Sequence, residues 1–500
     1  MLSRHLPRAL VAFAAAGAAL LAAARAPEVR ATSAPAGIAH VRILGINDLH
    51  GHLDPSDVGG RAAGGVAWLS SWLDSRDGDG IATIRVTAGD SPGASPLISA
   101  RFHDEPAVEA LNLMHFDVGT LGNHDFDEGP REMLRLVHGG DGFGGAAFPY
   151  VAANALDAQT GRPVLPPYVV LDRAGVKIGF IGVTTRASGR WLMPQYARQL
   201  RFTDISDTVN RYANELETRG VRAIVVLAHA GGVQESDEAG SGEIFDETRQ
   251  MTDAVDAVVS GHTHTLINVR VGHKRVTQAV AFGTAFGEID MSIDRRTGEV
   301  LETGADIVHA WDDGVEPDAR VAQMVERYRA RLGDLATRPI AFASAPITRQ
   351  PGPGGTSELG RLVADSERAA AHAQIAMVPP DWIRADLPAG PLTYSDLFDV
   401  QPFGNELIRM QMSGADLEAV LDQQSAPGQP ALNATGLQAR IEPGEHYSVV
   451  ASEFLAAGGE GFSAMRRGTD RRPVGRDVDA LAAYAASGAG SLLRPAATGT

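Results

Sequence analysis

The sequence contains no cysteine among its 500 residues. This absence excludes disulfides, thiol nucleophiles and lipid-modified cysteines. Long apolar runs are also absent beyond the N-terminal region, so no second membrane-spanning helix is expected. Basic residues are fewer than acidic ones, 44 Lys and Arg against 61 Asp and Glu. The net charge of −17 disfavours nucleic acid and anionic membranes as partners, so an anionic small substrate would need local positive charge or a metal ion.

The first 31 residues have the pattern of a secretory signal peptide. Arg4 and Arg8 precede a run rich in Ala and Leu, and cleavage would follow Ala31. A membrane anchor is the alternative, but the apolar run over residues 9–24 is shorter than the ~18 residues usually needed. Cleavage would leave a chain of net charge −20. We therefore expect a periplasmic or secreted protein with no membrane attachment.

The length and the order of patterns predict two domains. Short apolar runs alternate with helical patterns over residues 38–312, which favours a layered α/β domain. A charged amphipathic segment over 313–336 predicts a linker helix. Mixed strands and helices over 337–485 indicate a second domain, and residues 486–500 resemble a loose tail.

Polar residues and glycines follow five of the β-like runs in the first domain. The five stretches are "GINDLHGHLDP", "VTAGDSPG", "LGNHDFDEG", "VLAHAGG" and "SGHTH". In an open α/β sheet such strand ends converge on one crevice. The metal-ligating types that they bring are Asp48, His50, Asp90, Asn123, His229, His262 and His264.

Three oxygen and four nitrogen ligands are more than one metal ion needs. They suit two divalent ions that share a carboxylate, the arrangement used for phosphoester hydrolysis. Any single stretch could instead be a polar turn, but five in series are hard to explain in that way. Three further histidines, His52, His115 and His138, are expected to face solvent or cap helices.

These stretches resemble the successive motifs of the calcineurin-like metallophosphoesterases, in particular the exported bacterial 5′-nucleotidase and UDP-sugar hydrolase group. The resemblance covers most of residues 40–475. It implies a four-layer α/β/β/α first domain and a smaller α+β nucleotidase domain. It also permits Zn, Mn or Co as the two divalent ions.

The resemblance also implies a role for each residue of the first domain's site. One ion would take Asp48, His50 and His264. The other would take Asn123, His229 and His262, and Asp90 would bridge the two. His124 would face the substrate phosphate as a catalytic residue, and Asp127 would orient it. A hydroxide that bridges the ions would then attack phosphorus.

The second domain carries two aromatics in glycine-rich loops, Phe403 and Phe454. Such residues are often core plugs, but two of them can instead clamp a flat ring. In the resembled family this pair sandwiches the base, the position of Asn405 contacts the base edge, and an acid at Glu460 meets the ribose hydroxyls. Two arginines, Arg349 and Arg384, would bind the substrate's anionic groups.

The sequence departs from the resembled pattern around this clamp. "PPDW", residues 379–382, stands where the family has Asn-Gly-Gly-Gly, so bulky residues replace glycines. A second loop arginine of the family falls on Pro353. Glu460 replaces a more usual Asp, and the stretch between Gln424 and Tyr447 is short.

The sequence therefore predicts an exported two-metal phosphohydrolase that acts on small-molecule nucleotides. Other ester substrates within the same chemistry stay open: a UDP-sugar or NAD pyrophosphatase, a 2′,3′-cyclic-nucleotide phosphodiesterase, or a thiosulfohydrolase. A surface binding protein that kept the fold is the non-enzymatic alternative. The sequence does not predict an oligomeric state.

Overall fold

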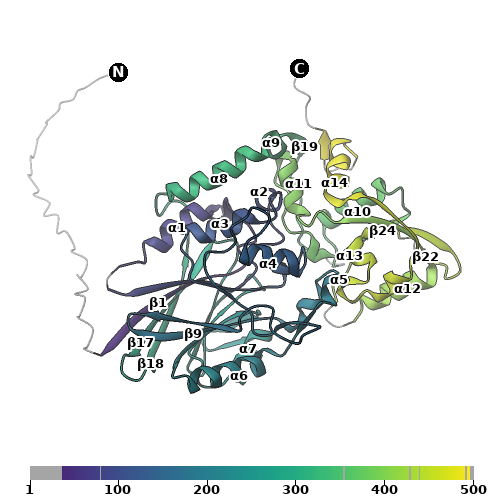
Figure 1. Cartoon of the computed structure of the whole chain (residues 1–500). Coiled ribbons are helices and arrows are strands. Elements are labelled where there is room, and N and C mark those ends of the chain that lie inside the picture. Colours follow the sequence, from purple (N-terminus) through teal and green to yellow (C-terminus); the bar gives the residue numbers. More distant parts are fainter. Residues whose placement is uncertain are drawn as a thin grey trace, which may run out of the picture. The chain divides into compact units, whose positions relative to one another are not determined.

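The computed structural model describes residues 37–78, 80–352, 355–426, 429–437, 440–489 and 493–495. The predicted signal peptide, Pro353 and most of the predicted tail lie outside these residues. No helix among the described residues is long and apolar enough to cross a membrane. Figure 1 shows the arrangement of the elements.

The first domain contains two six-stranded sheets, each with a parallel centre. In the first sheet β1, β4, β5 and β6 are parallel, and β17 and β18 continue it antiparallel. Its spatial order is β18 (Val300–His309), β17 (Ala285–Asp294), β1 (Ile38–Ile46), β4 (Ala82–Thr87), β5 (Val118–Thr120) and β6 (Tyr150–Val151).

The second sheet also contains four parallel strands but differs at its edges. Its central strands β9, β11, β14 and β16 are parallel, and an antiparallel strand closes each edge. Its spatial order is β15 (Leu266–Val271), β16 (Lys274–Ala279), β14 (Ala257–Ser260), β11 (Ala223–His229), β9 (Val176–Thr184) and β8 (Tyr168–Arg173). The strands β8 and β9 form an antiparallel hairpin.

The two sheets face each other across one apolar cluster. It joins Val41 and Ile84 of the first sheet to Phe180, Val225 and their neighbours in the second. These strands are buried on both faces, which explains their near-continuous runs of Val, Ile and Leu. The sheets therefore form the two inner layers of the domain.

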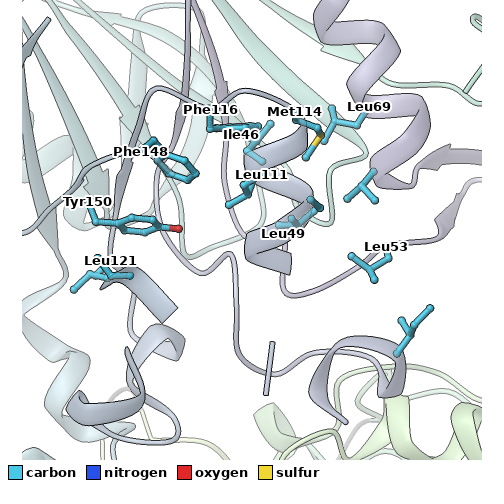
Figure 2. Close-up of a cluster of buried hydrophobic side chains, with 14 of the residues drawn as sticks. Ile46, Leu49, Leu53, Leu69, Leu111, Met114, Phe116, Leu121, Phe148 and Tyr150 are labelled. Carbon is cyan, nitrogen blue, oxygen red and sulfur yellow. The ribbon is translucent and has the colours of Figure 1, made fainter. Parts of the chain in front are cut away.

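Helices cover the outer face of each sheet. The first sheet packs against helices that include α1 (Val66–Asp74), α3 (Glu105–Leu113), α4 (Pro130–His138) and α8 (Ala319–Leu332). Figure 2 shows part of this cluster, where Leu69 of α1 and Leu111 of α3 lie near Leu49 and Leu53 of the segment after β1. The second sheet packs against α6 (Ile205–Thr218) and α7 (Glu243–Gln250). The predicted α/β/β/α order is confirmed.

The second domain is built on a five-stranded sheet. Its spatial order is β23 (Asn433–Thr435), β20 (Ile375–Val378), β24 (His446–Ser452), β22 (Glu406–Ser413) and β25 (Thr469–Arg476). A three-stranded sheet of β21 (Gly390–Thr393), β19 (Pro339–Ala343) and β26 (Leu493–Pro495) lies beside it in the same apolar core. The helices are α10 (Glu358–Ala370), α11 (Tyr394–Val400), α12 (Gly414–Gln423), α13 (Glu453–Ala456) and α14 (Asp477–Ala486).

The segment predicted as a linker forms α8 and the short helix α9 (Asp334–Thr337). Its apolar face, with Val321, Met324 and Tyr328, is buried in the helical layer of the first domain. The Ser70 hydroxyl of α1 donates to Asp318 at 2.9 Å. The segment is thus an integral part of that layer as well as the connection to the second domain.

Candidate metal centre and substrate cavity

The predicted ligands follow parallel strands of both sheets. Asp48 and His50 come after β1, Asp90 after β4, and Asn123 after β5 of the first sheet. In the second sheet His229 ends β11, and the pair His262 and His264 follows β14. The carboxyl ends of parallel strands meet at one edge of a sheet. The structure brings all seven residues together at the edge shared by the two sheets.

One group of ligand atoms belongs to Asp48, His50 and His264, which lie within 4.8 Å of one another. Asp48 Oδ1 is 3.4 Å from His264 Nε2 and 3.9 Å from His50 Nε2. The two imidazole Nε2 atoms are 3.2 Å apart. This is the set that the sequence assigned to one ion.

The second group contains Asp90, His229 and His262. Asp90 Oδ2 lies 3.0 Å from His229 Nε2 and 3.8 Å from His50 Nε2, which belongs to the first group. Asp90 thus stands between the groups, where a bridging carboxylate would be. Asn123 is buried beside them, and its Oδ1 has no hydrogen-bond partner in the described part of the chain.

The donor and acceptor pattern fits bound cations. His50 Nδ1 lies 2.7 Å from the carbonyl of Gly93, and His229 Nδ1 lies 2.9 Å from that of Ala88. A carbonyl only accepts, so each Nδ1 carries a proton and each Nε2 is the ring nitrogen directed at the centre. The two Nε2 atoms face carboxylate oxygens and another imidazole nitrogen, and a buried set of this kind holds a cation, either a metal ion or a proton. Burial disfavours a charged His229, but the carboxylates of Asp90 and Asp48 outweigh it and raise the pKa of His229 to about 9, so the site strongly favours positive charge.

Five of the seven ligand residues have a left-handed backbone. The φ angles are 50° at Asp48, 46° at His50, 50° at Asp90, 79° at His262 and 53° at His264. Residues other than glycine rarely adopt this conformation, although Asp and His tolerate it better than most. The turns that follow the strands therefore direct these side chains inward at a cost in backbone energy.

Asp125 supports the ligand turns without being part of either group. Its carboxylate accepts the backbone N–H of Asp90 at 3.0 Å and that of Gly122 at 2.7 Å. Burial raises the pKa of Asp125 to about 8, with a further contribution from the charge of Asp90. This residue ties the turn after β4 to the turn after β5.

His124 and Asp127 form the predicted pair. His124 Nδ1 lies 2.8 Å from Asp127 Oδ2, and the backbone N–H of His124 donates to Asp90 Oδ1 at 2.8 Å. Burial disfavours the charged imidazole, but the carboxylates of Asp127 and Asp90 outweigh it and raise the pKa of His124. With Nδ1 paired to Asp127, Nε2 is the ring nitrogen left for a ligand.

A cavity of about 630 Å³ opens over this centre and is lined by both domains. From the first domain it takes Asp90, Asn123, His124, His262 and His264. The lining residues from the second domain include Trp382, Arg384, Phe403, Asn405, Phe454 and Glu460. The cavity volume is that of a small-molecule site.

The two predicted arginines have different positions. Arg384 lines the cavity, where burial lowers its pKa and the negative charge of Asp90 opposes that shift. Arg349 is not among the lining residues. Its guanidinium donates to the carbonyls of Ile383 at 3.3 Å and Arg384 at 2.7 Å. Arg349 thus holds the loop that presents Arg384.

The aromatic residues of the second domain form a continuous series of ring contacts with His124. The His124 and Phe403 rings are stacked, with centroids 5.7 Å apart at an interplanar angle of 23°. Trp382 lies 4.8 Å from Phe403 with its ring tilted by 44°, and it stacks on Phe454 at 4.8 Å and 28°. The Trp382 indole N–H donates to Glu460 Oε1 at 2.6 Å. Asn405 donates from its side-chain amide to Asp477 at 3.1 Å.

The structure corrects one prediction about the other histidines. His52 is half-buried and stacks on Phe282, with ring centroids 4.0 Å apart, rather than facing solvent. Burial lowers the pKa of His52 to about 3. His115 and His138 are exposed, as expected.

Two residues near the centre were missed by the sequence analysis. Trp191 lines the cavity with its ring 5.0 Å from that of His262. Asn47 donates to Asp48 Oδ2 at 2.7 Å and accepts the backbone N–H of Ala279. The position of Asn47, a polar residue directly before the predicted ligand Asp48, was a signal that could have identified it. Trp191 was not marked, because this residue lies within the loop between β9 and β11 and does not directly follow a strand.

The paired sheets and the Asp, His and Asn cluster at their shared edge define a metallophosphoesterase domain. Family models agree: the calcineurin-like phosphoesterase model matches residues 41–266, and the 5′-nucleotidase C-terminal domain model matches residues 336–445. The chain therefore belongs to the calcineurin-like phosphoesterases that carry a 5′-nucleotidase C-terminal domain, a family of metal-dependent phosphoester hydrolases.

Curated relatives and solved structures are similar over most of the chain. Endonuclease YhcR of Bacillus subtilis is 34% identical over 79% of this chain and 34% of its own length. Cell wall protein Lmo0130 of Listeria monocytogenes is 30% identical over 89% of this chain and 66% of its own length. The chain thus spans only part of these relatives. The crystal structure of a 5′-nucleotidase precursor from Thermus thermophilus shares the fold, with a TM-score of 0.77, 24% identity and coverage of 89% of this chain and 96% of that one.

Proposed function

We propose that the protein is an exported, two-metal phosphohydrolase that releases phosphate from nucleotides. The observation that carries the proposal is one cavity that is lined by members of both groups of metal-ligating residues, by the His124–Asp127 pair and by Arg384. This combination provides for binding a phosphate, for protonating a leaving oxygen and for holding two cations. Membership of the family supports the hydrolytic chemistry.

The residues of this chain have separable tasks in that reaction. Arg384 neutralises and orients the phosphate through its fork of N–H donors. His124, with Nδ1 held by Asp127, directs Nε2 to the phosphate or the leaving oxygen and supplies a proton there. Two divalent ions held by the seven ligands would provide a water of lowered pKa and offset the charge of the phosphoryl oxygens.

Hydrolysis of a panel of substrates tests the proposal, with inorganic phosphate, nucleoside monophosphate and sulfate each measured as products. The protein, stripped of metal and reloaded with Zn, Mn or Co, is offered AMP, UMP, UDP-glucose, NAD, 2′,3′-cyclic AMP and thiosulfate esters. We expect metal-dependent release of phosphate from nucleoside monophosphates. Activity confined to a diester, a pyrophosphate or a sulfur ester would replace the nucleotide assignment with that alternative. No hydrolysis with any metal would favour a binding protein.

Asp90 provides the matched test of the two-ion arrangement. Asp90→Asn should nearly abolish activity and lower the bound metal below two ions per chain, because Asp90 Oδ2 lies near histidines of both groups. Asp313→Asn removes an exposed carboxylate that pairs with Arg61, and should leave both quantities unchanged. Two ions and full activity in the Asp90 variant would rule out the bridging role.

Export is proposed from the sequence pattern of residues 1–31, which lie outside the described residues. The relative Lmo0130 is named a cell wall protein. Expression of the full chain in a bacterial host, followed by mass spectrometry of the mature N-terminus, tests the proposal. We expect a chain that begins at Thr32 outside the cytoplasm. An intact N-terminus in the cytoplasmic fraction would contradict it.

A further inference from the structure

The aromatic slot in the second domain is already filled by a side chain of the protein. Trp382 makes ring contacts with both Phe403 and Phe454, each at a centroid distance of 4.8 Å. Among the ring pairs of the described residues, the two phenyl rings contact Trp382 and not each other. The indole therefore occupies the space between the two rings on which a base was predicted to stack.

A hydrogen bond holds the indole in this position. Its Nε1–H donates at 2.6 Å to Glu460 Oε1, and Glu460 is 4% exposed. The other carboxylate oxygen, Oε2, is buried and has no hydrogen-bond partner among the described residues. If Trp382 swung out of the slot, the Glu460 carboxylate would keep no hydrogen bond to that part of the chain. Burying an unpaired carboxylate is costly, so the filled slot is the favoured state.

We propose that Trp382 is a specificity-determining residue: by filling the slot between Phe403 and Phe454 it makes the enzyme read the phosphate and the adjoining sugar but not the base. This inference rests on the proposed phosphohydrolase function. The cavity still offers Arg384 for the phosphate, and the unpartnered Glu460 Oε2 can accept a hydroxyl. The substrate class is then phosphate monoesters of sugars and nucleosides alike, with no preference among bases.

The test compares two substrates that differ only in the base. kcat/KM is measured for AMP and for ribose 5-phosphate with the metal-loaded protein. For the wild type we expect a ratio of AMP to ribose 5-phosphate within about threefold of one, since no stacking energy is available. A wild-type ratio above about tenfold that falls on removal of the indole would show that Trp382 itself binds the base, and would overturn the inference.

Substitutions of Trp382 and Phe454 test whether an emptied slot accepts the base. Trp382→Ala empties it, and we expect the same ratio to rise about tenfold as the base enters between the phenyl rings. Trp382→Phe keeps a ring in the slot without the N–H donor, and its ratio should stay near that of the wild type. The double variant Trp382→Ala, Phe454→Ala should lose the gain, because one stacking face is gone. An unchanged ratio in Trp382→Ala would contradict the proposal.

Adenosine binding separates failure of this inference from failure of the proposed function. Adenosine has a base and a ribose but no phosphate, so calorimetry with the metal-free protein needs no hydrolysis. We expect no saturable binding by the wild type and saturable binding by Trp382→Ala. Binding by the wild type that the substitution abolishes would overturn the inference even if hydrolysis is confirmed. If the wild type hydrolyses no phosphomonoester but the adenosine results hold, the proposed function fails and the filled slot stands.

Discussion

His124 is fixed from several directions at once. Asp127 holds its Nδ1, Asp90 accepts its backbone N–H, and Phe403 of the second domain stacks on its ring. None of these contacts uses the imidazole Nε2. These contacts leave Nε2 as the ring nitrogen available to a substrate, while the neighbouring Asn123 and Asp125 are directed to the metal-ligating cluster and its turns.

Replacing His124 should therefore lower the rate without removing metal. We expect His124→Ala to reduce kcat by about 10²–10⁴-fold, the usual range for a general acid or base. Metal content per chain, measured by mass spectrometry, should stay at the wild-type value. His138→Ala, an exposed histidine at the end of α4, is the control and should change neither quantity. Loss of metal together with rate would make His124 a ligand.

Asp256 gives a pH dependence of stability that is independent of the metal centre. It precedes β14 and accepts the backbone N–H of Ile224 at 2.9 Å. Burial raises its pKa to about 7, Glu299 adds to the rise, and Lys274 opposes it. A carboxyl with a raised folded-state pKa stabilises fully below its unfolded pKa of 3.8, and this stability is lost as pH rises through about 7.

Asp256→Asn should therefore stabilise the protein at pH 8 but not at pH 4. The amide keeps an acceptor for the Ile224 N–H and cannot ionise. We expect a gain of about 2–4 kcal/mol in the free energy of urea unfolding at pH 8, from a pKa shift of that size. Asp253→Asn, a control at an exposed partner of Lys274, should show no such pH-dependent gain. Equal effects of the Asp256 substitution at both pH values would contradict this account.

At the residue scale, the sequence best predicted the placement of metal-ligating residue types that directly follow a strand. All seven predicted ligands and the His124–Asp127 pair lie at one centre, because each follows a parallel strand and such ends converge. The placement of Trp382 could not be predicted. Its neighbours Phe403, Phe454 and Glu460 come from separate loops, and only the folded second domain determines which ring lies between the others.

At the scale of elements, local signals predicted where a helix begins and ends better than which other elements it packs against. Asp204 caps α6 by accepting the N–H of Asp207, and the helix ends two residues before Gly220; a capping Asp and a following Gly are local signals of helix ends. The amphipathic segment over 313–336 was predicted as a linker without a partner. Its partners are α1 and α3, which lie more than 200 residues earlier in the chain. Periodicity reveals an apolar face but not what covers it.

The packing of α8 can be tested by a substitution that creates a cavity beneath the helix. Met324 is fully buried against the helical layer of the first domain. Met324→Ala should lower the free energy of unfolding by about 2–5 kcal/mol, as for other large-to-small changes in a core. Gln323→Ala, on the exposed face of the same helix, should have an effect within about 0.5 kcal/mol. If the two substitutions had equal small effects, α8 would be a free linker.

At the scale of the whole molecule, metal binding should stabilise the folded chain. The ligands come from both sheets, so ions join two layers that the unfolded chain does not bring together. At metal concentrations of 100 times the dissociation constant the gain is about 2.7 kcal/mol. We expect thermal unfolding to shift upward when Mn or Zn is added to EDTA-treated protein, and Asp90→Asn to reduce the shift. No shift with any of the three metals would contradict the metal centre.

The layered architecture was predictable from the order of patterns, but the pairing of the domains over the cavity was not. Strand and helix patterns alternate along the first domain, and such alternation favours stacked layers. The contact of Phe403 with His124 joins residues 279 positions apart, and no local signal in either loop refers to the other. The second domain thus contributes residues that line the cavity over the metal-ligating cluster.

The left-handed backbone of the ligand turns has a consequence for how the chain can drift in evolution. At Asp48, His50, Asp90, His262 and His264, glycine would relieve strain of about 1 kcal/mol at each position. Glycine at Asp90 or Asp48 would also remove the carboxylate that accepts the backbone N–H of His124 or His262. Glycine loses more backbone freedom on folding than these residues do, which offsets the relief of strain. A single substitution to glycine therefore gains little stability, and the chain has no stepwise route of rising stability by which to lose the centre.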